Sequence, residues 1–324
     1  MTGIEVSGLT KTYRRGLAGE TVRALVDVSL TIPPGEAFGI IGPNGAGKTT
    51  FLGCLLGFLR PDHGEITIDG RAPDDLAVRA ATGYLPERLV LDRWMTGRGF
   101  LAYHHALARL SPQSRDAEVD SALVRVGLAE ARDQIVRRYS RGMLQRLGLA
   151  QALLGRPRYV FLDEPASGVD PAGVVLFRHL LSELKQQNVT VILNSHQLEQ
   201  VERVCDRVAF VRAGRVEAIE TISAGAALAR VLRVRAAGGA IGGRVTREML
   251  AALATQAGAE LRSVAAPEAR FAVADDAGAA RLIETLVTGG VPVAEVTPEE
   301  SRLERLFLDA VPAATPAAVP EEQG

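Results

Sequence analysis

Apolar and polar positions alternate in two different ways over the first 220 residues, and this predicts strands and helices in alternation. Every-second-residue patterns predict strands over Ile4–Leu9 and Val26–Ile32. Continuous apolar runs at Ala37–Ile41, Tyr159–Leu162 and Val189–Leu193 are typical of strands buried on both faces of a parallel sheet. The pattern therefore indicates an α/β fold.

Helical spacing dominates residues 96–136, which predicts a helical insertion over about 88–156 inside a domain covering 1–220. After residue 221, alanine and glycine increase, and the pattern predicts a small α+β domain of β-α-β-β-α-β order over 221–310. Its last element is an amphipathic helix at Ser301–Leu308. The stretch 311–324 is rich in alanine and proline, and we expect a disordered tail there.

Composition narrows the class of protein. The chain of 324 residues has a formal net charge of −1, which argues weakly against a nucleic-acid surface. No apolar run is long enough to span a membrane and Met1–Lys11 lacks a signal-peptide pattern, so we expect a cytoplasmic location. Cys54 and Cys205 cannot form a disulfide framework, and both are expected to be buried thiols.

A phosphate-binding pattern, G-x-x-x-x-G-K-[ST], occupies residues 42–49 between a predicted strand and a predicted helix. Small residues let the backbone N–H groups turn toward phosphate oxygens, and the helix start adds a positive dipole end. Lys48 reaches the β- and γ-phosphates in such loops, and the Thr49 hydroxyl holds Mg²⁺. The chain has only three lysines against 34 arginines, so a lysine here fits a site that needs a compact charge. The alternative is a glycine-rich turn that matches by chance, which the flanking elements disfavour.

Two adjacent carboxylates, Asp163 and Glu164, follow a buried strand. The carboxyl ends of parallel strands open onto the ligand crevice of an α/β sheet. One carboxylate there holds Mg²⁺, and its neighbour orients or deprotonates an attacking water. Alone, the pair is equally consistent with a strand-to-turn junction whose acids are solvated, but the phosphate loop favours the first interpretation.

Together these motifs resemble the nucleotide-binding subunit of an ATP-binding-cassette (ABC) transporter over about residues 4–220. The resemblance implies a P-loop ABC ATPase domain with a RecA-like core, an antiparallel β subdomain and a helical subdomain. It implies ATP and Mg²⁺ as cofactors. Ser167–Asp170 resembles the D-loop, and Tyr139–Met143 stands in the place of the family signature.

Site residues follow from the same resemblance. Lys48, Glu164 and His196 are expected to be catalytic, and Thr49, Asp163 and Glu87 to hold the metal. Tyr13 resembles the residue that stacks on adenine, although an edge-strand tyrosine is the alternative. The nucleotide contacts implied are those of Tyr13, Gly42, Pro43, Asn44, Gly45, Ala46, Gly47, Lys48, Thr49, Thr50, Glu87, Ser140, Gly142 and Asp170.

Two positions depart from the usual family pattern. Arg141 replaces a signature glycine, and it either strengthens anion binding or points to solvent. Glu87 replaces the Q-loop glutamine and brings a negative charge near the phosphates. Both variants, with the helix Ser301–Leu308, resemble the bacterial exporter-type branch.

The function implied is an ATPase that works as a homodimer, at the inner face of the cell membrane, and drives export through a separate integral membrane permease subunit. We expect no nucleic-acid partner. Trp94, the only tryptophan, is a hypothetical anchor for the membrane subunit together with Arg93, unless it packs inside the helical subdomain. The alternatives are a soluble ABC protein acting on nucleic acid or ribosomes, for which the heptad arrays are missing, and a regulator without turnover, which Glu164 disfavours.

Overall fold

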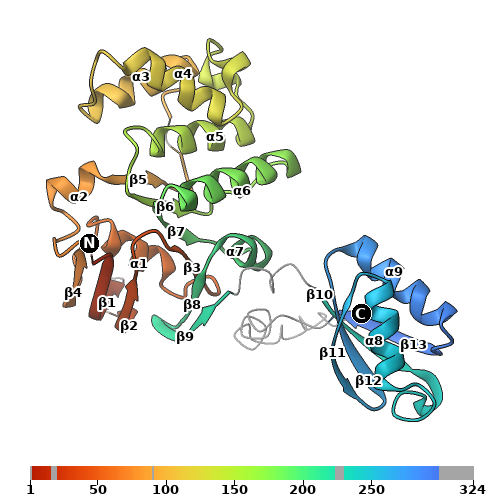
Figure 1. Ribbon diagram of the computed structural model, residues 1–324. Helices are drawn as coiled ribbons and strands as arrows, with labels where there is room; N and C mark the ends of the chain where they lie inside the picture. The colour runs from red at the N-terminus through yellow and green to blue at the C-terminus, as the bar shows by residue number, and fades with distance from the viewer. Residues whose placement is uncertain (1, 16–19, 90, 223–229, 299–324) are drawn as a thin grey trace, which may run out of the picture. The chain divides into compact units, whose positions relative to one another are not determined.

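The computed structural model describes residues 2–15, 20–89, 91–222 and 230–298. The chain divides into two compact units, one that runs to Thr221 and a second that begins at Ile222 (Figure 1). The predicted terminal helix Ser301–Leu308 and the predicted tail 311–324 lie outside the described residues.

A three-stranded antiparallel sheet opens the first unit. Its order is β2-β1-β4, with β1 at Ile4–Arg15, β2 at Glu20–Ile32 and β4 at His63–Ile68. β1 and β2 extend beyond their predicted limits because their pairing continues through register shifts to Arg14↔Thr21. The partner strand satisfies the backbone there, so pairing persists where the alternating pattern has ended.

A six-stranded sheet forms the centre of the first unit, in the order β5-β6-β7-β3-β8-β9. All neighbours are parallel except β8 and β9. The carboxyl ends of β3, β6 and β7 therefore meet at one edge of the sheet, where α/β folds bind ligands. The strands are β3 Ala37–Ile41, β5 Thr82–Leu85, β6 Tyr159–Asp163, β7 Thr190–Asn194, β8 Arg207–Arg212 and β9 Arg215–Thr221.

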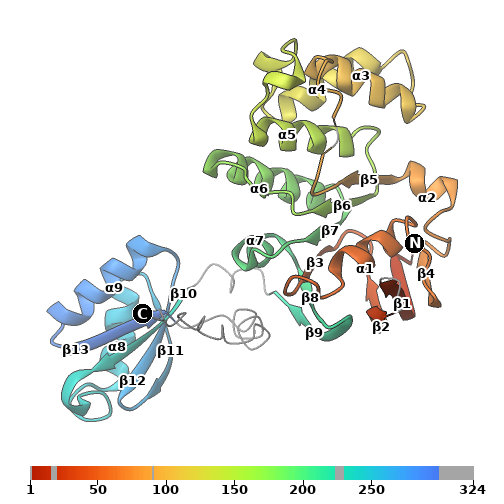
Figure 2. The same ribbon diagram turned by 180° about the vertical axis from the view of Figure 1, so that it is seen from behind.

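Helix α1, Lys48–Leu55, lies between the two sheets and packs against β2 and β7 (Figure 2). Its buried Phe51 and Leu55 share one core with Phe161 of β6 and Ile192 of β7. The loop that precedes α1 is thus held at both ends by a packed interior, which limits its freedom before any ligand binds.

Helices α3 Gly97–Leu107, α4 Arg115–Arg125 and α5 Arg141–Ala152 pack on one another, and α5 also contacts β5. The sequence pattern did not predict three further helices: α2 Leu76–Ala80, α6 Pro171–Gln186 and α7 Leu198–Val204. Single 3₁₀ turns occur at Ala129–Ala131, Val136–Arg138 and Ala237–Gly239. Among the described residues, no helix has the length and apolar character needed to cross a membrane.

The second unit has the predicted β-α-β-β-α-β order. It comprises β10 Arg230–Ala236, α8 Arg247–Gln256, β11 Glu260–Ala265, β12 Glu268–Val273, α9 Asp276–Thr288 and β13 Val293–Pro298. The antiparallel sheet order is β11-β12-β10-β13. Leu232, Val234 and Phe271 form its core with Leu250 of α8 and Leu282 of α9, so the unit has an interior of its own.

Candidate functional site

The loop between β3 and α1 has a backbone that only glycine tolerates at two positions. Gly42 has φ 155°, and a Cβ there would run into the carbonyl of Val211. Gly47 caps α1 with φ 105°, and a Cβ there would run into the carbonyl of Ala24. The loop therefore curls tightly beneath the helix start, as a phosphate cradle requires.

Lys48, the first residue of α1, is 8% exposed. Its Nζ donates to the carbonyl of Gly42 at 2.8 Å and to that of Pro43 at 3.1 Å. Burial lowers the pKa of the Lys48 ammonium, and the neighbouring carboxylates of Glu164 and Asp163 oppose that shift. Burial therefore disfavours the charged form of Lys48, and the nearby carboxylates favour it.

Asp163 is the last residue of β6 and is only 4% exposed. It accepts a hydrogen bond of 2.6 Å from Nδ2 of Asn194, the last residue of the neighbouring β7. Burial raises the pKa of Asp163, although the Asn194 hydrogen bond opposes the shift. An oxygen ligand held this firmly, in a place where its charge is costly, suits a bound cation.

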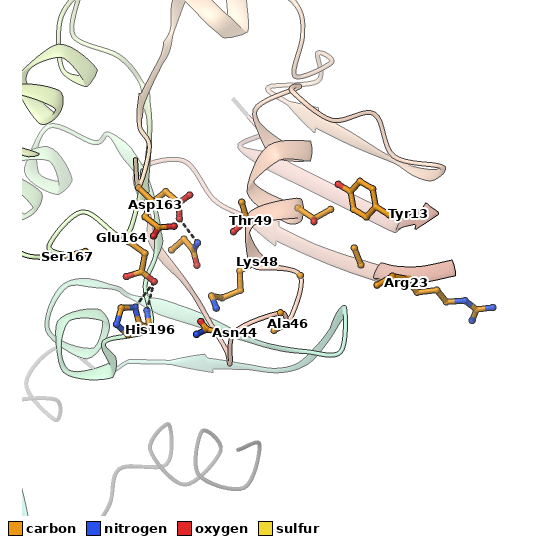
Figure 3. A pocket seen from close by; sticks show the side chains of 17 residues that line it. Tyr13, Arg23, Asn44, Ala46, Lys48, Thr49, Asp163, Glu164, Ser167 and His196 are labelled. Carbon is orange, nitrogen blue, oxygen red and sulfur yellow. Dashed lines mark hydrogen bonds and ion pairs between the residues drawn. The ribbon is translucent and has the colours of Figure 1, made fainter. Parts of the chain in front are cut away.

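Glu164 and His196 face each other across the cavity edge (Figure 3). His196 donates its backbone N–H to Glu164 Oε1 at 3.0 Å, and its Nδ1 lies 2.8 Å from the same oxygen. Glu164 adopts φ 49°, a left-handed conformation that costs a non-glycine residue about 1–3 kcal/mol. The backbone of the turn after β6 is therefore strained at the residue whose carboxylate contacts His196.

A cavity of about 460 Å³ joins these groups. It is lined by Tyr13, Val22, Arg23, Ala24, Asn44, Gly45, Ala46, Gly47, Lys48, Thr49, Thr50, Glu87, Asp163, Glu164, Ser167, Asn194 and His196. Twelve of these belong to the predicted site, and Val22, Arg23, Ala24, Ser167 and Asn194 are additional.

The five other predicted residues lie outside the cavity lining. Gly42 and Pro43 form the back of the loop, where their carbonyls accept from Lys48. Ser140 and Asp170 cap helices α5 and α6, accepting from the N–H groups of Met143 and Gly173 respectively.

Gly142 lies beside the second of these caps. A Cβ added to it would lie 4.0 Å from Oδ1 of Asp170. Ser140, Gly142 and Asp170 form what we call the helix-start surface, which belongs to the same chain but does not line its cavity.

Tyr13 lines the cavity on the side away from Glu164 (Figure 3). At Tyr13 β1 pairs with β2 alone, because its pairing with β4 ends at Thr10, so Tyr13 holds a local edge position and also lines the cavity. The ring is 38% exposed, and Nζ of Lys11 lies 5.8 Å from its centroid. An exposed aromatic face at a cavity rim is suited to stacking on a planar ligand.

Oxygen donors suited to Mg²⁺ come from Thr49, Asp163 and Glu87, all of which line the cavity. Within the described ranges, no group of three or more His, Cys, Asp or Glu side chains could hold a metal by itself. Mg²⁺ usually takes one or two carboxylates and completes its shell with water and substrate phosphates. The residues present fit a metal that arrives with a phosphate ligand.

Cysteines and histidines outside the cavity have structural roles. Cys54 and Cys205 are buried free thiols, as expected. His105 is fully buried, and its Nε2 lies 3.1 Å from the carboxylate of Glu118 on the neighbouring helix. His104 packs against Phe100 with ring centroids 4.4 Å apart and ring planes tilted by 51°. The histidine pair therefore packs the helical subdomain.

Two groups of lining residues escaped the sequence argument. Val22, Arg23 and Ala24 reach the cavity only because β2 lies over the loop, a tertiary contact with no local signal. Asn194 did carry a signal: it is a polar residue at the carboxyl end of a buried strand, the same position that identified Asp163.

Comparison with known proteins gives consistent matches. A model of the ABC transporter family matches residues 25–167. An uncharacterized ABC transporter ATP-binding protein of Synechocystis sp. is 41% identical over 216 residues, which are 66% of this chain but only 61% of that protein. The daunorubicin resistance ATP-binding protein DrrA3 of Streptomyces coeruleorubidus is 37% identical over 217 residues, 66% of this chain and 67% of that protein.

Among solved structures, an ATP-binding cassette determined as a dimer in a post-hydrolysis state with ADP and Pi is similar with a TM-score of 0.63. It is 25% identical, and the match covers 68% of this chain and 99% of that chain. The fold, the phosphate loop and these relatives agree. The chain belongs to the ABC transporter ATP-binding proteins.

Proposed function

We propose that this chain binds ATP with Mg²⁺ in the cavity around Lys48 and hydrolyses it as a homodimer, driving export through a separate membrane subunit. The observation that carries the proposal is the convergence, in one cavity, of a phosphate loop, a buried carboxylate and the Glu164–His196 pair. These are the parts that phosphoryl transfer to water requires.

Phosphate binding is assigned to Lys48 and to the N–H groups at the start of α1. The loop that carries these donors lines the cavity and leads into the packed helix α1, so little ordering remains to be done on binding. The adenine is assigned to the ring of Tyr13, at the far side of the cavity.

The metal is assigned to Thr49 and Asp163, with Glu87 reaching it directly or through water. When bound, Mg²⁺ would neutralise charge on the phosphate oxygens. Asn194 holds Asp163 in one orientation, and the cation would offset the free-energy cost of burying that carboxylate.

Glu164 is assigned as the base that takes a proton from the attacking water. If His196 is neutral and donates Nδ1–H to Glu164, its Nε2 is an acceptor. The same ring can then orient the carboxylate and accept a hydrogen bond from the attacking water near the γ-phosphate.

Glu164→Gln tests the assignment because it preserves shape while removing the base. We expect the variant to bind Mg-ATP with an affinity near that of the parent, and kcat to fall about 10²- to 10⁴-fold. His196→Ala is the companion variant, with an intact base that lacks its orienting partner. If the Gln variant hydrolysed ATP at the parent rate, Glu164 would not be the base.

Dimerisation is proposed because Ser140, Gly142 and Asp170 do not line the cavity of their own chain, whereas a second copy could present its helix-start surface to that nucleotide. The similar cassette solved as a dimer supports this arrangement. A nucleotide contacted by both copies would stabilise the closed dimer by its differential affinity. Glu164→Gln with Mg-ATP should therefore accumulate as a dimer in size-exclusion chromatography.

The export direction is inferred from the exporter-type signature and from similarity to a daunorubicin resistance protein. A methionine import ATP-binding protein is also similar, so the direction of transport has to be measured separately. Co-expression with the permease and assay of inside-out vesicles would decide it: ATP-dependent accumulation corresponds to export.

The membrane subunit is proposed to contact Trp94 at the peripheral, cytoplasmic face of the membrane. Trp94 is 74% exposed, so its side chain is not buried inside the helical subdomain, although the guanidinium of Arg137 lies 5.3 Å from its ring. Trp94→Ala should uncouple ATP hydrolysis from transport while leaving basal hydrolysis intact. Unaltered assembly and transport would exclude the contact.

A further inference from the structure

Arg141, which replaces a signature glycine, lies against the Ser167–Asp170 loop of its own chain. Its Nη2 donates to Oγ of Ser167 at 3.1 Å. Arg141 is exposed, and its guanidinium contacts a neighbouring loop, a contact that the two alternatives drawn from the sequence did not include.

Gly168 makes room for the arginine. Its φ is 72°, and a Cβ added there would lie 2.6 Å from Cδ and 2.7 Å from Cζ of Arg141. These separations are too short for real side chains, so the arginine stem occupies the space above Gly168. The contact thus depends on two features at once, a hydroxyl at 167 and a missing side chain at 168.

The loop connects this contact to the chemistry. Ser167 lines the nucleotide cavity on the side of Glu164, opposite Tyr13 (Figure 3). Its N–H donates to the carbonyl of Glu164 at 3.1 Å. Arg141 begins helix α5, so one hydrogen bond joins the start of that helix to the turn that holds the proposed base.

We propose that Arg141 is a positioning residue that acts through Ser167: it holds the Ser167–Asp170 loop against the start of α5 and so keeps the Glu164 turn in its hydrolytic geometry. The inference rests on the proposed ATPase function. Tyr13 and the phosphate loop lie elsewhere in the cavity, so ATP binding should be nearly independent of this contact while turnover depends on it.

A double-mutant cycle tests the link. Arg141→Ala and Ser167→Ala should each lower kcat about fivefold, the size expected for one lost hydrogen bond, with KM for ATP unchanged within about twofold. The double variant should be no slower than either single variant, because both remove the same contact. Ser167→Thr keeps the hydroxyl and should retain most of the parent kcat. Multiplicative losses, or a raised KM with normal kcat, would overturn the proposal.

Arg138→Ala is the matched control, since it removes another exposed arginine three residues earlier and should leave kcat unchanged. An equal loss in this control would reduce Arg141 to a general charge effect.

Amide hydrogen exchange gives a readout without ATP. Arg141→Ala should speed exchange at Ser167 and Val169, and unchanged exchange would contradict the contact. If the parent protein hydrolysed no ATP, the proposed function would fail, while the exchange measurement would still test the contact.

Discussion

Lys48 must fit a compact charge into a buried space. It is buried, its Nζ is fixed by two loop carbonyls, and carboxylates lie nearby. A planar guanidinium is larger and distributes its charge, so it cannot replace a point charge in the same space. This explains why a lysine stands here in a chain that otherwise uses arginine.

Lys48→Arg should therefore weaken Mg-ATP binding at least about tenfold, equivalent to about 1.4 kcal/mol, although charge is conserved. Isothermal titration calorimetry with a non-hydrolysable analogue measures it. Lys185→Arg is the control, because Lys185 forms a part-exposed ion pair of 2.6 Å with Asp206 and does not line the cavity. Equal affinities for both variants would contradict the argument.

Tyr159 provides a residue-scale test of pH dependence away from the chemistry. Burial, followed by a hydrogen bond to Asp69, raises the pKa of Tyr159 to about 12. Because the folded state prefers the neutral phenol, its contribution to stability is complete below pH about 10 and is lost as pH rises toward about 12.

The parent protein should thus lose up to about 2–3 kcal/mol more unfolding free energy than Tyr159→Phe between pH 9 and pH 12. Urea unfolding at several pH values gives the comparison. A gap between the two proteins that stays constant across this range would show that the phenol does not titrate as described.

At the scale of elements, the phosphate loop depends on its backbone path. Gly47 and Gly45 both have positive φ, 105° and 79°, but only Gly47 faces a backbone atom at close range, and nothing lies within 4 Å of a Cβ at Gly45. The two glycines therefore separate the cost of conformation from the cost of steric overlap.

Gly47→Ala should cost more than about 2 kcal/mol of unfolding free energy, whereas Gly45→Ala should cost about 1 kcal/mol, the penalty for a left-handed alanine alone. Urea midpoints measured on both variants provide the test. Equal costs would mean that the Ala24 carbonyl moves away freely.

Much of the first unit could be predicted element by element because its parallel strands are short apolar runs bounded by glycine, proline and acids. The predicted Tyr159–Leu162 differs from β6 by one residue. Helix α2 was missed because five residues are too few for a helical period to emerge. The extra length of β1 and β2 was missed because it comes from pairing between strands, as in Tyr13↔Val22.

The site divides in the same way. Loop residues and the acids at strand ends were predicted, since each carries a local signal. Ala24 and the Arg141–Ser167 contact were not, because they join segments distant in sequence.

At the scale of the whole molecule, the proposed homodimer would have two half-sites in each copy: the cavity, to which we assign the chemistry, and the helix-start surface, which does not line it. Two copies would complete both. The second unit has a separate core, and the residues that line the cavity all belong to the first unit. Turnover should therefore depend on encounter between first units.

Specific ATPase activity measured over a wide range of protein concentration, with Mg²⁺ present, tests this most directly. Activity per chain should rise with protein concentration and reach a plateau as dimers form. Chelation of Mg²⁺ should abolish the activity. Full activity per chain at concentrations where mass photometry detects only monomers would contradict it.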